Sequence, residues 1–325
     1  MSENEITIKV RELTKHFGDF PAVNGIDFDV YRGEIFGFLG PNGSGKTTTI
    51  RMMLGLLQPT SGEAEVLGIH VNENPEQIRP RVGYMSQRFS LYNDLTVIQN
   101  LRFYGRAYGI NNTELDARIQ DALNMAGLVG RERTHTKDLA GGWRQRLALS
   151  VAIMHRPEVI FLDEPTAGVD PVSRRDFWDL LYELVSDGVT VFVTTHYMDE
   201  AEHCQRLAFI QDGQIIAYGA PEEIKRKTMK GQVLEISPSK PAEAIAALEE
   251  AKQAGKLLID DVELYGSMVH VFSKDIKKQE KEIVSLLSKN NIVIYHMALV
   301  EPSLEDVFIA SMKEGITKFE LSKSE

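Results

Sequence analysis

At 325 residues, the chain is long enough for one large domain and a smaller one. Its 43% apolar and 26% charged residues exclude a disordered or fibrous protein and are typical of a globular one. A net charge of −11 at pH 7 argues against broad nucleic-acid binding, which favours a basic face, so we expect no nucleic-acid partner.

The sequence also indicates the compartment. It has no run of 18 apolar residues that would predict a membrane span, and MSENEITIKV at its start lacks the pattern of a signal peptide. A lone cysteine, Cys204, excludes an internal disulfide, fits a reducing cytosol and is expected to be a small buried apolar side chain. We therefore expect a cytoplasmic protein, for which any work at a membrane needs a partner that spans it.

Residues 1–224 alternate short apolar runs with helical stretches. We expect strands in ITIKVREL, IDFDVY, EIFGFLG, AEVLGIHV and RVGYMSQ, followed by a long helical region from about Leu95 to Ala126. VIFLDEP and VTVFVTTH are continuous apolar runs, as expected for buried parallel strands. RLAFIQDGQIIAYG predicts a hairpin whose Asp212-Gly213 pair favours a type I′ turn. Together these elements predict an α/β core with an antiparallel edge and a helical insertion.

The pattern changes near residue 230. GQVLEIS, PAEAIAALEEAKQAG, KLLIDDVELYG, SMVHVFS, KKQEKEIVSLLSKN and NIVIYHMAL predict strand, helix, strand, strand, helix and strand. That order is the ferredoxin-like split βαβ unit. A last helix, at about residues 303–313, precedes a polar tail. We therefore expect domains at residues 1–228, with a helical subdomain at about 88–155, and at 229–313, then a tail at 314–325.

Residues 40–47, GPNGSGKT, match the phosphate-binding pattern G-x-x-x-x-G-K-[ST], and they follow a predicted strand and precede a predicted helix. Glycines permit the backbone N–H groups to turn inward around phosphate oxygens. The positive end of the following helix points at the same anion. Lys46 is expected to neutralise the β- and γ-phosphates, and Thr47 to offer a hydroxyl to Mg²⁺.

Two acidic residues end the apolar strand VIFLDEP. Asp163 is expected beside the metal, and Glu164 is expected to face a water that attacks the γ-phosphorus. A general base of this kind contributes about 10²–10⁴-fold to a rate. The alternative is that the two acids cap a helix.

Two more strand ends supply polar side chains. His196, after VTVFVTTH, is expected to hydrogen-bond the γ-phosphate and the attacking water, unless it is a structural histidine. Gln87, which ends RVGYMSQ, is expected to offer an amide oxygen to Mg²⁺.

With these motifs in order, residues 5–224 resemble the ATP-binding subunit of an ABC transporter. GPNGSGKTTT resembles the Walker A loop, Gln87 the Q-loop, LAGGWRQRL the signature, VIFLDEP the Walker B strand, AGVD at 167–170 the D-loop and His196 the switch histidine. The resemblance implies a P-loop NTPase core of the ABC type with an antiparallel β edge and a helical subdomain, beside the small α+β domain. Phe17 matches the aromatic residue that stacks on adenine, with a core phenylalanine as the alternative.

The resemblance also implies the site residues and the ligands, ATP and Mg²⁺. The catalytic residues would be Glu164, His196 and Lys46, and the metal would be held by Thr47, Gln87 and Asp163. The nucleotide would be bound by Phe17, Gly40, Pro41, Asn42, Gly43, Ser44, Gly45, Lys46, Thr47, Thr48, Gln87, Leu139, Ala140, Gly141, Gly142 and Asp170.

In this family, two such domains pack head to tail, and the signature of one closes over ATP held by the other. Gly141 and Gly142 would lack side chains because a γ-phosphate of the neighbouring subunit approaches their backbone. Trp143 would pack near that nucleotide or serve ordinary packing. The chain has one set of motifs, so the resemblance implies a second nucleotide-binding subunit, in a homodimer or a heterodimer.

The segment LYNDLTVIQNLRFYGRAYG and the ending EPSLEDVFIASM resemble the drug-resistance, daunorubicin-type exporter ATPases. This implies an exporter subunit on the cytoplasmic face of the cell membrane, whose residues 95–126 contact a separate integral membrane permease. Three alternatives stay open: an importer ATPase with a regulatory C-terminal domain, an ABC ATPase of translation or DNA repair, and a nucleotide-binding protein without turnover. The C-terminal region is regulatory or supports dimerisation, and the substrate is not encoded in these residues.

The signature departs from the family at one position, where Ala140 replaces the usual serine. A lost hydrogen bond to a charged group costs roughly 1.5–3 kcal/mol. We hypothesise a weakened but working site, or a heterodimer whose partner carries the intact signature. In the first case, Ala140→Ser is expected to raise ATP turnover or nucleotide affinity, as measured by phosphate release and equilibrium binding. An unchanged variant would exclude that case.

Overall fold

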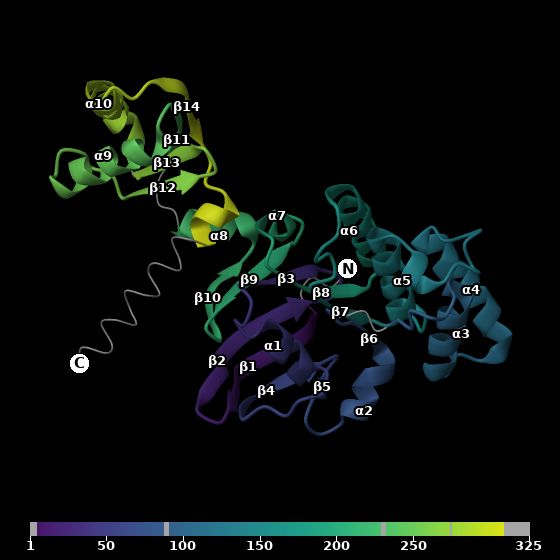
Figure 1. Ribbon diagram of the computed structural model, residues 1–325. Helices are drawn as coiled ribbons and strands as arrows, with labels where there is room; N and C mark the ends of the chain where they lie inside the picture. The colour runs from purple at the N-terminus through teal and green to yellow at the C-terminus, as the bar shows by residue number, and fades with distance from the viewer. Residues whose placement is uncertain (1–4, 88–90, 229–231, 274, 309–325) are drawn as a thin grey trace. The chain divides into compact units, whose positions relative to one another are not determined.

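The computed structural model describes residues 5–87, 91–228, 232–273 and 275–308 (Figure 1). By its internal contacts the chain divides into two compact units, Met1–Pro221 and Glu222–Glu325. The domain boundary that we predict lies at residue 228, and the difference corresponds to helix α8, Pro221–Thr228. None of the helices in the described ranges has the length and apolar character that crossing a bilayer requires.

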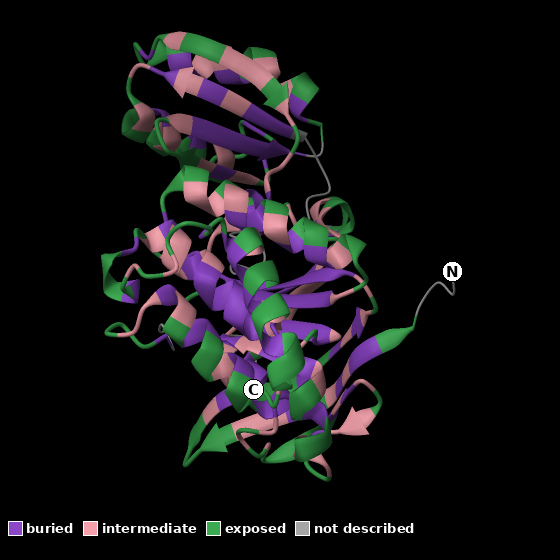
Figure 2. Ribbon diagram, turned by 90° about the vertical axis from the view of Figure 1, so that its right-hand side faces the viewer, coloured by how far each residue is buried: buried purple, intermediate pink, exposed green. Residues whose placement is uncertain are grey.

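The first unit is built on a six-stranded sheet with the order β10-β9-β3-β8-β7-β6. All neighbouring strands are parallel except β9 and β10, which form the predicted antiparallel hairpin. The strands are β3 (Ile35–Leu39), β6 (Val82–Met85), β7 (Val159–Asp163), β8 (Thr190–Thr195), β9 (Arg206–Gln211) and β10 (Gln214–Gly219). Every residue of β3, β7 and β8 is buried (Figure 2). Their β-branched and aromatic side chains suit strands covered on both faces, as the continuous apolar runs predict.

The turn between β9 and β10 confirms one local prediction. Asp212 and Gly213 both have positive φ, at 48° and 77°, as a type I′ turn requires.

A second sheet of the first unit is antiparallel, with the order β2-β1-β4-β5. Its strands are β1 (Ile6–Phe17), β2 (Phe20–Tyr31), β4 (Ser61–Val66) and β5 (Ile69–His70). The prediction of a single strand in AEVLGIHV is wrong. Leu67 and Gly68 have φ of 55° and 70°, so the chain turns back there and divides the segment into two paired strands.

The helices of the first unit occupy the connections between strands. They are α1 (Lys46–Met53), α2 (Pro75–Ile78), α3 (Val97–Ala107), α4 (Asn112–Ala126), α5 (Gly141–Ile153), α6 (Pro171–Ser186) and α7 (Met198–Ala201), with 3-10 turns η1 (Arg79–Arg81) and η2 (Thr136–Asp138). The predicted helical region from Leu95 to Ala126 is therefore two helices. A capping box formed by Thr96 and Gln99 begins α3, and Gly127 with φ of 67° ends α4.

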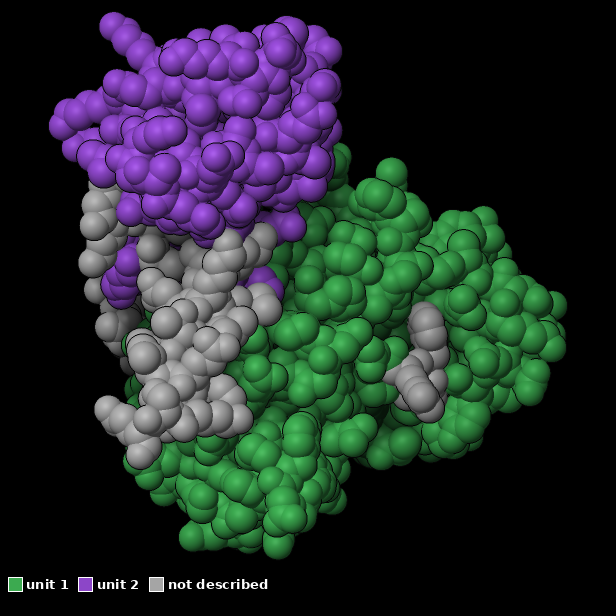
Figure 3. Space-filling model, turned by 60° about the vertical axis from the view of Figure 1, so that its left-hand side comes forward, with its two compact units in different colours: residues 1–221 green, residues 222–325 purple. Residues whose placement is uncertain are grey.

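The second unit, purple in Figure 3, has its own sheet and its own buried core. Its elements are β11 (Gln232–Pro238), α9 (Pro241–Gln253), β12 (Asp261–Tyr265), β13 (Met268–Ser273), α10 (Ile276–Lys289) and β14 (Ile294–Val300). The strands are antiparallel in the order β12-β13-β11-β14, and the element order is the one that the sequence predicts. Residues 304–308 are helical, and the rest of the predicted last helix and the tail lie outside the described residues.

A buried charged group joins those helical residues to the sheet. The imidazole of His270, only 3% exposed, lies 3.0 Å from Asp306 Oδ1 through Nδ1 and 3.2 Å from Glu235 Oε2 through Nε2. Burial disfavours the imidazolium, but the hydrogen bonds and attraction of the two carboxylates outweigh it and raise the pKa of His270. Burial also disfavours the charged form of Asp306, but hydrogen bonds from His270 and Ser303 lower its pKa on balance. The two groups therefore form an ion pair at mildly acidic pH.

The variant Asp306→Asn tests this ion pair. Because the pKa of His270 is raised, its contribution is present at low pH and is lost as the pH rises through that pKa. We expect the variant to lower the free energy of local opening at β13 by roughly 1.5–3 kcal/mol at about pH 6. The loss is expected to be smaller at about pH 9, because the charged fraction of the imidazole falls as the pH rises.

The measurement is hydrogen exchange of peptides from β13 in the full chain, corrected for the intrinsic exchange rate at each pH. Glu305→Gln is the control, because Glu305 is the exposed neighbour of Asp306. Equal losses at both pH values would show that the charge of His270 makes no contribution.

Candidate functional site

The phosphate loop connects β3 to α1, and its positions are glycine for different structural reasons. A Cβ on Gly40 would lie 2.1 Å from the carbonyl oxygen of Ile210, and one on Gly45 would lie 2.5 Å from that of Ala22, so packing excludes a side chain at both. Gly43 has φ of 84° and open space around it. The loop is thus held from behind by its own chain, with its exposed side formed by Pro41, Asn42 and Gly43.

Lys46 begins α1 and is 4% exposed. Its Nζ donates hydrogen bonds to the carbonyl oxygens of Gly40 (2.7 Å) and Pro41 (3.0 Å) and lies 3.1 Å from Glu164 Oε1. The ammonium is therefore inside the loop, where the sequence predicts a phosphate-neutralising charge, and Glu164 is its counter-ion in this structure.

Thr47 and Asp163 are also brought together. The Thr47 hydroxyl donates to Asp163 Oδ2 at 2.8 Å, and the Thr194 hydroxyl donates to Oδ1 at 2.8 Å. Asp163 ends β7 and is 1% exposed. A carboxylate and a hydroxyl are oxygen ligands of the kind that Mg²⁺ prefers. No cluster of three or more His, Cys, Asp or Glu residues that could hold a metal occurs in the described ranges.

Glu164 has an unusual backbone, with φ of 49° in a residue that is not glycine. Its N–H donates to the carbonyl and hydroxyl oxygens of Thr194, at 3.1 and 3.0 Å, which hold this conformation. The side chain is 7% exposed and accepts a hydrogen bond from Gln87 Nε2 at 3.0 Å. His196 Nδ1 lies 3.3 Å from the same carboxylate.

The four side chains Lys46, Gln87, Glu164 and His196 therefore meet, although they are up to 150 positions apart in the sequence. They meet because the strands before them are parallel neighbours, whose carboxyl ends lie at one edge of the sheet. Thr194 is a site residue that the sequence analysis missed. The sequence signal that could have identified it is the pair Thr194 and Thr195 at the end of a buried, mostly apolar strand.

The alternative that Asp163 and Glu164 cap a helix does not hold. The next helix, α6, is capped by Asp170, whose Oδ1 accepts from the N–H groups of Val172 (3.1 Å) and Ser173 (3.0 Å). Those hydrogen bonds, led by the one from Ser173, lower the pKa of Asp170. Asp170, a predicted nucleotide-binding residue, thus has a structural duty in this chain.

The signature segment begins α5, with Ala140 as its N-cap and no side-chain hydrogen bond there. Leu139 is buried in the core, so its side chain does not face outward. Around Gly141 the structure is open, with nothing within 4 Å of a Cβ built there. A Cβ on Gly142, by contrast, would lie 2.4 Å from Ser173 Oγ. For Gly142, close packing against α6 of the same chain is thus a sufficient reason for the absent side chain, and the approach of a phosphate to its backbone stays a prediction.

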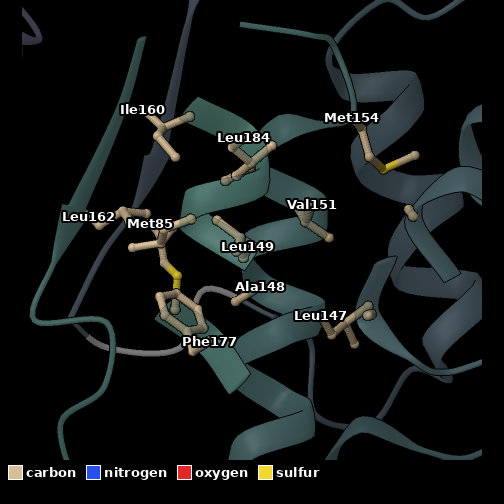
Figure 4. Packing of buried hydrophobic residues seen from close by; sticks show 14 of the residues in the cluster. Met85, Leu147, Ala148, Leu149, Val151, Met154, Ile160, Leu162, Phe177 and Leu184 are labelled. Atoms are coloured by element: carbon tan, nitrogen blue, oxygen red, sulfur yellow. The ribbon is translucent and has the colours of Figure 1, made fainter. Parts of the chain in front are cut away.

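The helix that carries the signature is anchored in the larger core of the first unit. Leu147, Leu149 and Val151 of α5 belong to the same buried cluster as Leu162 of β7 and Phe177 of α6 (Figure 4). Trp143 packs partly against this cluster, and the Arg131 guanidinium lies 3.7 Å from its ring centroid. These contacts agree with ordinary packing for Trp143, and its approach to a neighbouring nucleotide stays a prediction.

Phe17 ends β1 and is 52% exposed, which excludes the alternative of a core phenylalanine. Lys15 Nζ lies 5.3 Å from the centroid of the Phe17 ring. An exposed aromatic ring of this kind is available for stacking on a planar ligand.

The fold and the loop define a P-loop protein with a mostly parallel sheet. Residues 23–167 match the family described as ABC transporter, and residues 219–312 match the family described as ATP-binding protein DrrA1-3-like, C-terminal domain. The Nod factor export ATP-binding protein I of Cupriavidus metallidurans is 34% identical over 303 residues, which cover 93% of this chain and 96% of that protein. The chain belongs to the ATP-binding proteins of ABC transporters, a family of ATPases.

Two further similarities bear on the function. The probable multidrug ABC transporter ATP-binding protein YbhF of Escherichia coli is 50% identical over 224 residues, which cover 69% of this chain but 39% of that protein. The chain therefore spans about two fifths of the length of that relative. The structure described as a dimeric, post-hydrolysis state of the ATP-binding cassette MJ0796 bound to ADP and Pi has a TM-score of 0.60 and 28% identity, covering 66% of this chain and 98% of that one.

The packing reason for Gly142 is testable by Gly142→Ala. The added methyl group would lie 2.4 Å from Ser173 Oγ and 2.5 Å from Ser173 Cβ. We expect a loss of about 1–3 kcal/mol from overpacking, which exceeds the gain in helix propensity of about 1 kcal/mol. The measurement is denaturant unfolding of the first unit.

Gly141→Ala is the matched control, because its methyl group meets open space and is expected to stabilise the helix slightly. Adding Ser173→Gly to Gly142→Ala is expected to recover part of the loss. Equal stability of the two alanine variants would refute the packing explanation.

Proposed function

We propose that this chain is the ATP-hydrolysing subunit of an exporter, which works as a dimer on the cytoplasmic face of the membrane with a separate permease. The single observation that carries the hydrolytic part is the meeting of Lys46, Gln87 and His196 around the buried carboxylate of Glu164. A cation, an amide and an imidazole around one carboxylate form the donor set that phosphoryl transfer to water uses.

The loop fits a nucleotide phosphate group. Among the described residues, Ser44 Oγ is buried and has no hydrogen-bond partner. Gly43 leaves open space beside this hydroxyl, and Lys46 provides charge inside the loop. The Thr47 hydroxyl and the Asp163 carboxylate fit Mg²⁺, with Gln87 as a further oxygen donor. Bound Mg²⁺ and ATP would supply the γ-phosphoryl group and a positive charge that stabilises the transition state.

The residues of the chain then have separate tasks. Lys46 exchanges its counter-ion Glu164 for a phosphate, which leaves the carboxylate with Gln87 and His196 as its neighbours. Glu164, no longer paired with an ammonium, accepts a proton from the attacking water. His196 holds its imidazole beside that carboxylate, and Thr194 holds the Glu164 backbone in its positive-φ conformation.

A second subunit completes the site in this proposal. The open space around Gly141 and the free N-terminal end of α5 support an approach of phosphate from outside the chain. The two-fold homodimer is the simplest arrangement for a chain with one set of motifs. A heterodimer is the form in which a partner with an intact signature serine would compensate for Ala140. The similar cassette solved as a dimer supports pairing.

Exposed aromatic residues support a permease contact on the helical part. Tyr92, Phe103 and Tyr108 are between 38% and 48% exposed, and Tyr92 and Phe103 are in edge-to-face contact with ring centroids 4.9 Å apart. Large apolar rings left in solvent mark interaction surfaces. We infer export because relatives are named for Nod factor export and for probable multidrug transport.

Glu164→Gln tests the hydrolytic part. The amide cannot accept the proton from water, so turnover is expected to fall by about 10²–10⁴-fold. Nucleotide binding is expected to persist, because Lys46 and the loop are unchanged, and the variant with Mg²⁺ and ATP is expected to sediment as a dimer. Phosphate release, equilibrium dialysis and sedimentation measure these three properties.

Glu183→Gln, an exposed acid on α6, is the matched control and should hydrolyse ATP as the unmodified chain does. A Glu164→Gln variant with normal turnover would refute the assignment of the base. An unmodified chain that binds but never hydrolyses ATP, even with its permease, would support the alternative of a binding protein without turnover.

A further inference from the structure

Arg174 lies in the first turns of α6, directly after the D-loop, and its side chain reaches the segment that follows the switch histidine. The guanidinium Cζ lies 4.2 Å from the centroid of the Tyr197 ring. Nη1 donates to Asp199 Oδ2 at 3.1 Å, and Nε lies 3.4 Å from Glu200 Oε1. The Arg174 side chain is 17% exposed, and of its two acidic partners Glu200 is 1% exposed and Asp199 is 69% exposed, so the ion pair with Glu200 is the one shielded from solvent.

One of these partners is a buried acid. Glu200 is 1% exposed, and its Oε1 also accepts a hydrogen bond from the Thr166 hydroxyl. A carboxylate at this depth needs a charged partner, because desolvation of an unpaired ion is costly. Arg174 is that partner, and Thr166 follows Glu164 by two positions. The ion pair with Arg174 therefore connects the short helix α7 to the start of α6, and the hydrogen bond from Thr166 connects it to the segment that follows β7.

Tyr197, the aromatic partner of Arg174, lies against the imidazole of His196. The rings of His196 and Tyr197 have centroids 4.2 Å apart, and His196 Nδ1 lies 3.3 Å from Glu164 Oε2. The Tyr197 N–H donates to Thr195 Oγ1 at 3.0 Å, which restrains the backbone at this point. A planar cation against one aromatic ring, and that ring against the imidazole, leave His196 little freedom to rotate.

We propose that Arg174 is a positioning residue for ATP hydrolysis, which holds residues 196–200 and thereby the His196 imidazole beside Glu164. This rests on the proposed function. The N–H of Arg174 donates to the Asp170 carbonyl oxygen at 2.9 Å, so Arg174 is fixed to the end of the D-loop. A displacement of that loop, for example by a second subunit, is transmitted to the imidazole through a guanidinium and one aromatic ring.

The test uses the full chain with Arg174→Ala, Arg174→Lys and the neighbouring Arg175→Ala as the matched control. Arg175 is exposed and has no ion pair among the described residues. Because misplacement of a reacting group by about 1 Å costs on the order of 100-fold, we expect Arg174→Ala to lower kcat by about 10–100-fold. The ATP dissociation constant, which depends on the phosphate loop, is expected to stay within about twofold. Lysine retains the charge but not the planar stack, so it should rescue only part of kcat.

If Arg174 only stabilised the fold, its effect on kcat would depend neither on the Tyr197 stack nor on the His196 imidazole. Tyr197→Leu removes the stack but leaves the ion pair with Glu200 intact, and it is expected to lower kcat as Arg174→Ala does. If Arg174→Ala folds poorly, adding Glu200→Gln removes the unpaired buried charge. In a chain that already carries His196→Ala, Arg174→Ala should have no further effect on kcat, because both changes act through the imidazole. Independent, multiplying losses in that double variant would overturn the proposal.

A second readout separates this proposal from the proposed function. The His196 ring signal in the NMR spectrum, assigned by its loss in His196→Ala, is expected to shift in Arg174→Lys and to stay in place in Arg175→Ala. If the unmodified chain shows no ATP turnover but the signal shifts, the proposed function fails and the positioning contact stands. If turnover is normal while Arg174→Lys and Tyr197→Leu change neither kcat nor the signal, the positioning role is refuted.

Discussion

Two acidic side chains are buried next to each other at the end of β7, and the rest of the site depends on stabilising them. Asp163 and Glu164 are 1% and 7% exposed, and an unpaired carboxylate at that depth is strongly destabilising. Threonine hydroxyls hold the first, and Lys46 with Gln87 holds the second. Because these partners come from separate strand ends and from α1, the pair is satisfied only when the whole parallel sheet has assembled. Assembly of the sheet therefore also sets the geometry of the site.

Three residues near the site combine a structural role with a predicted or proposed functional one. Asp170 caps α6, Gly142 permits α6 to pack against α5, and Arg174 neutralises the buried Glu200. All three lie where the D-loop, the signature helix and the segment after His196 approach one another within the first unit. Close packing of this kind transmits small displacements, because packed elements change between discrete arrangements rather than deforming continuously. The second unit has a separate core and a separate buried charge at His270.

Contiguous motifs were predictable, because a loop that binds phosphate needs fixed residue types at fixed spacings. The same holds for the strands β3, β7 and β8, whose apolar runs are long and uninterrupted, and for the type I′ turn at Asp212. Local patterns failed where a turn left no composition signal, as at Leu67, whose positive φ divides a predicted strand. Local sequence patterns also could not distinguish exposed from buried aromatic residues. Phe17 is exposed because it ends an antiparallel hairpin, which neighbouring sequence does not reveal.

By itself, the sequence determined the class of protein, the order of its motifs and the residue types available for nucleotide chemistry, since these depend on spacing along the chain. The tertiary structure decided which of them meet. It brought His196 and Gln87 to Glu164, assigned Gly142 to helix packing, turned Leu139 into the core and paired Arg174 with Glu200. The physical reason is that hydrogen bonds, ion pairs and close packing act over a few ångströms. Only the register of the strands and the packing of the helices bring residues that are distant in sequence within that range.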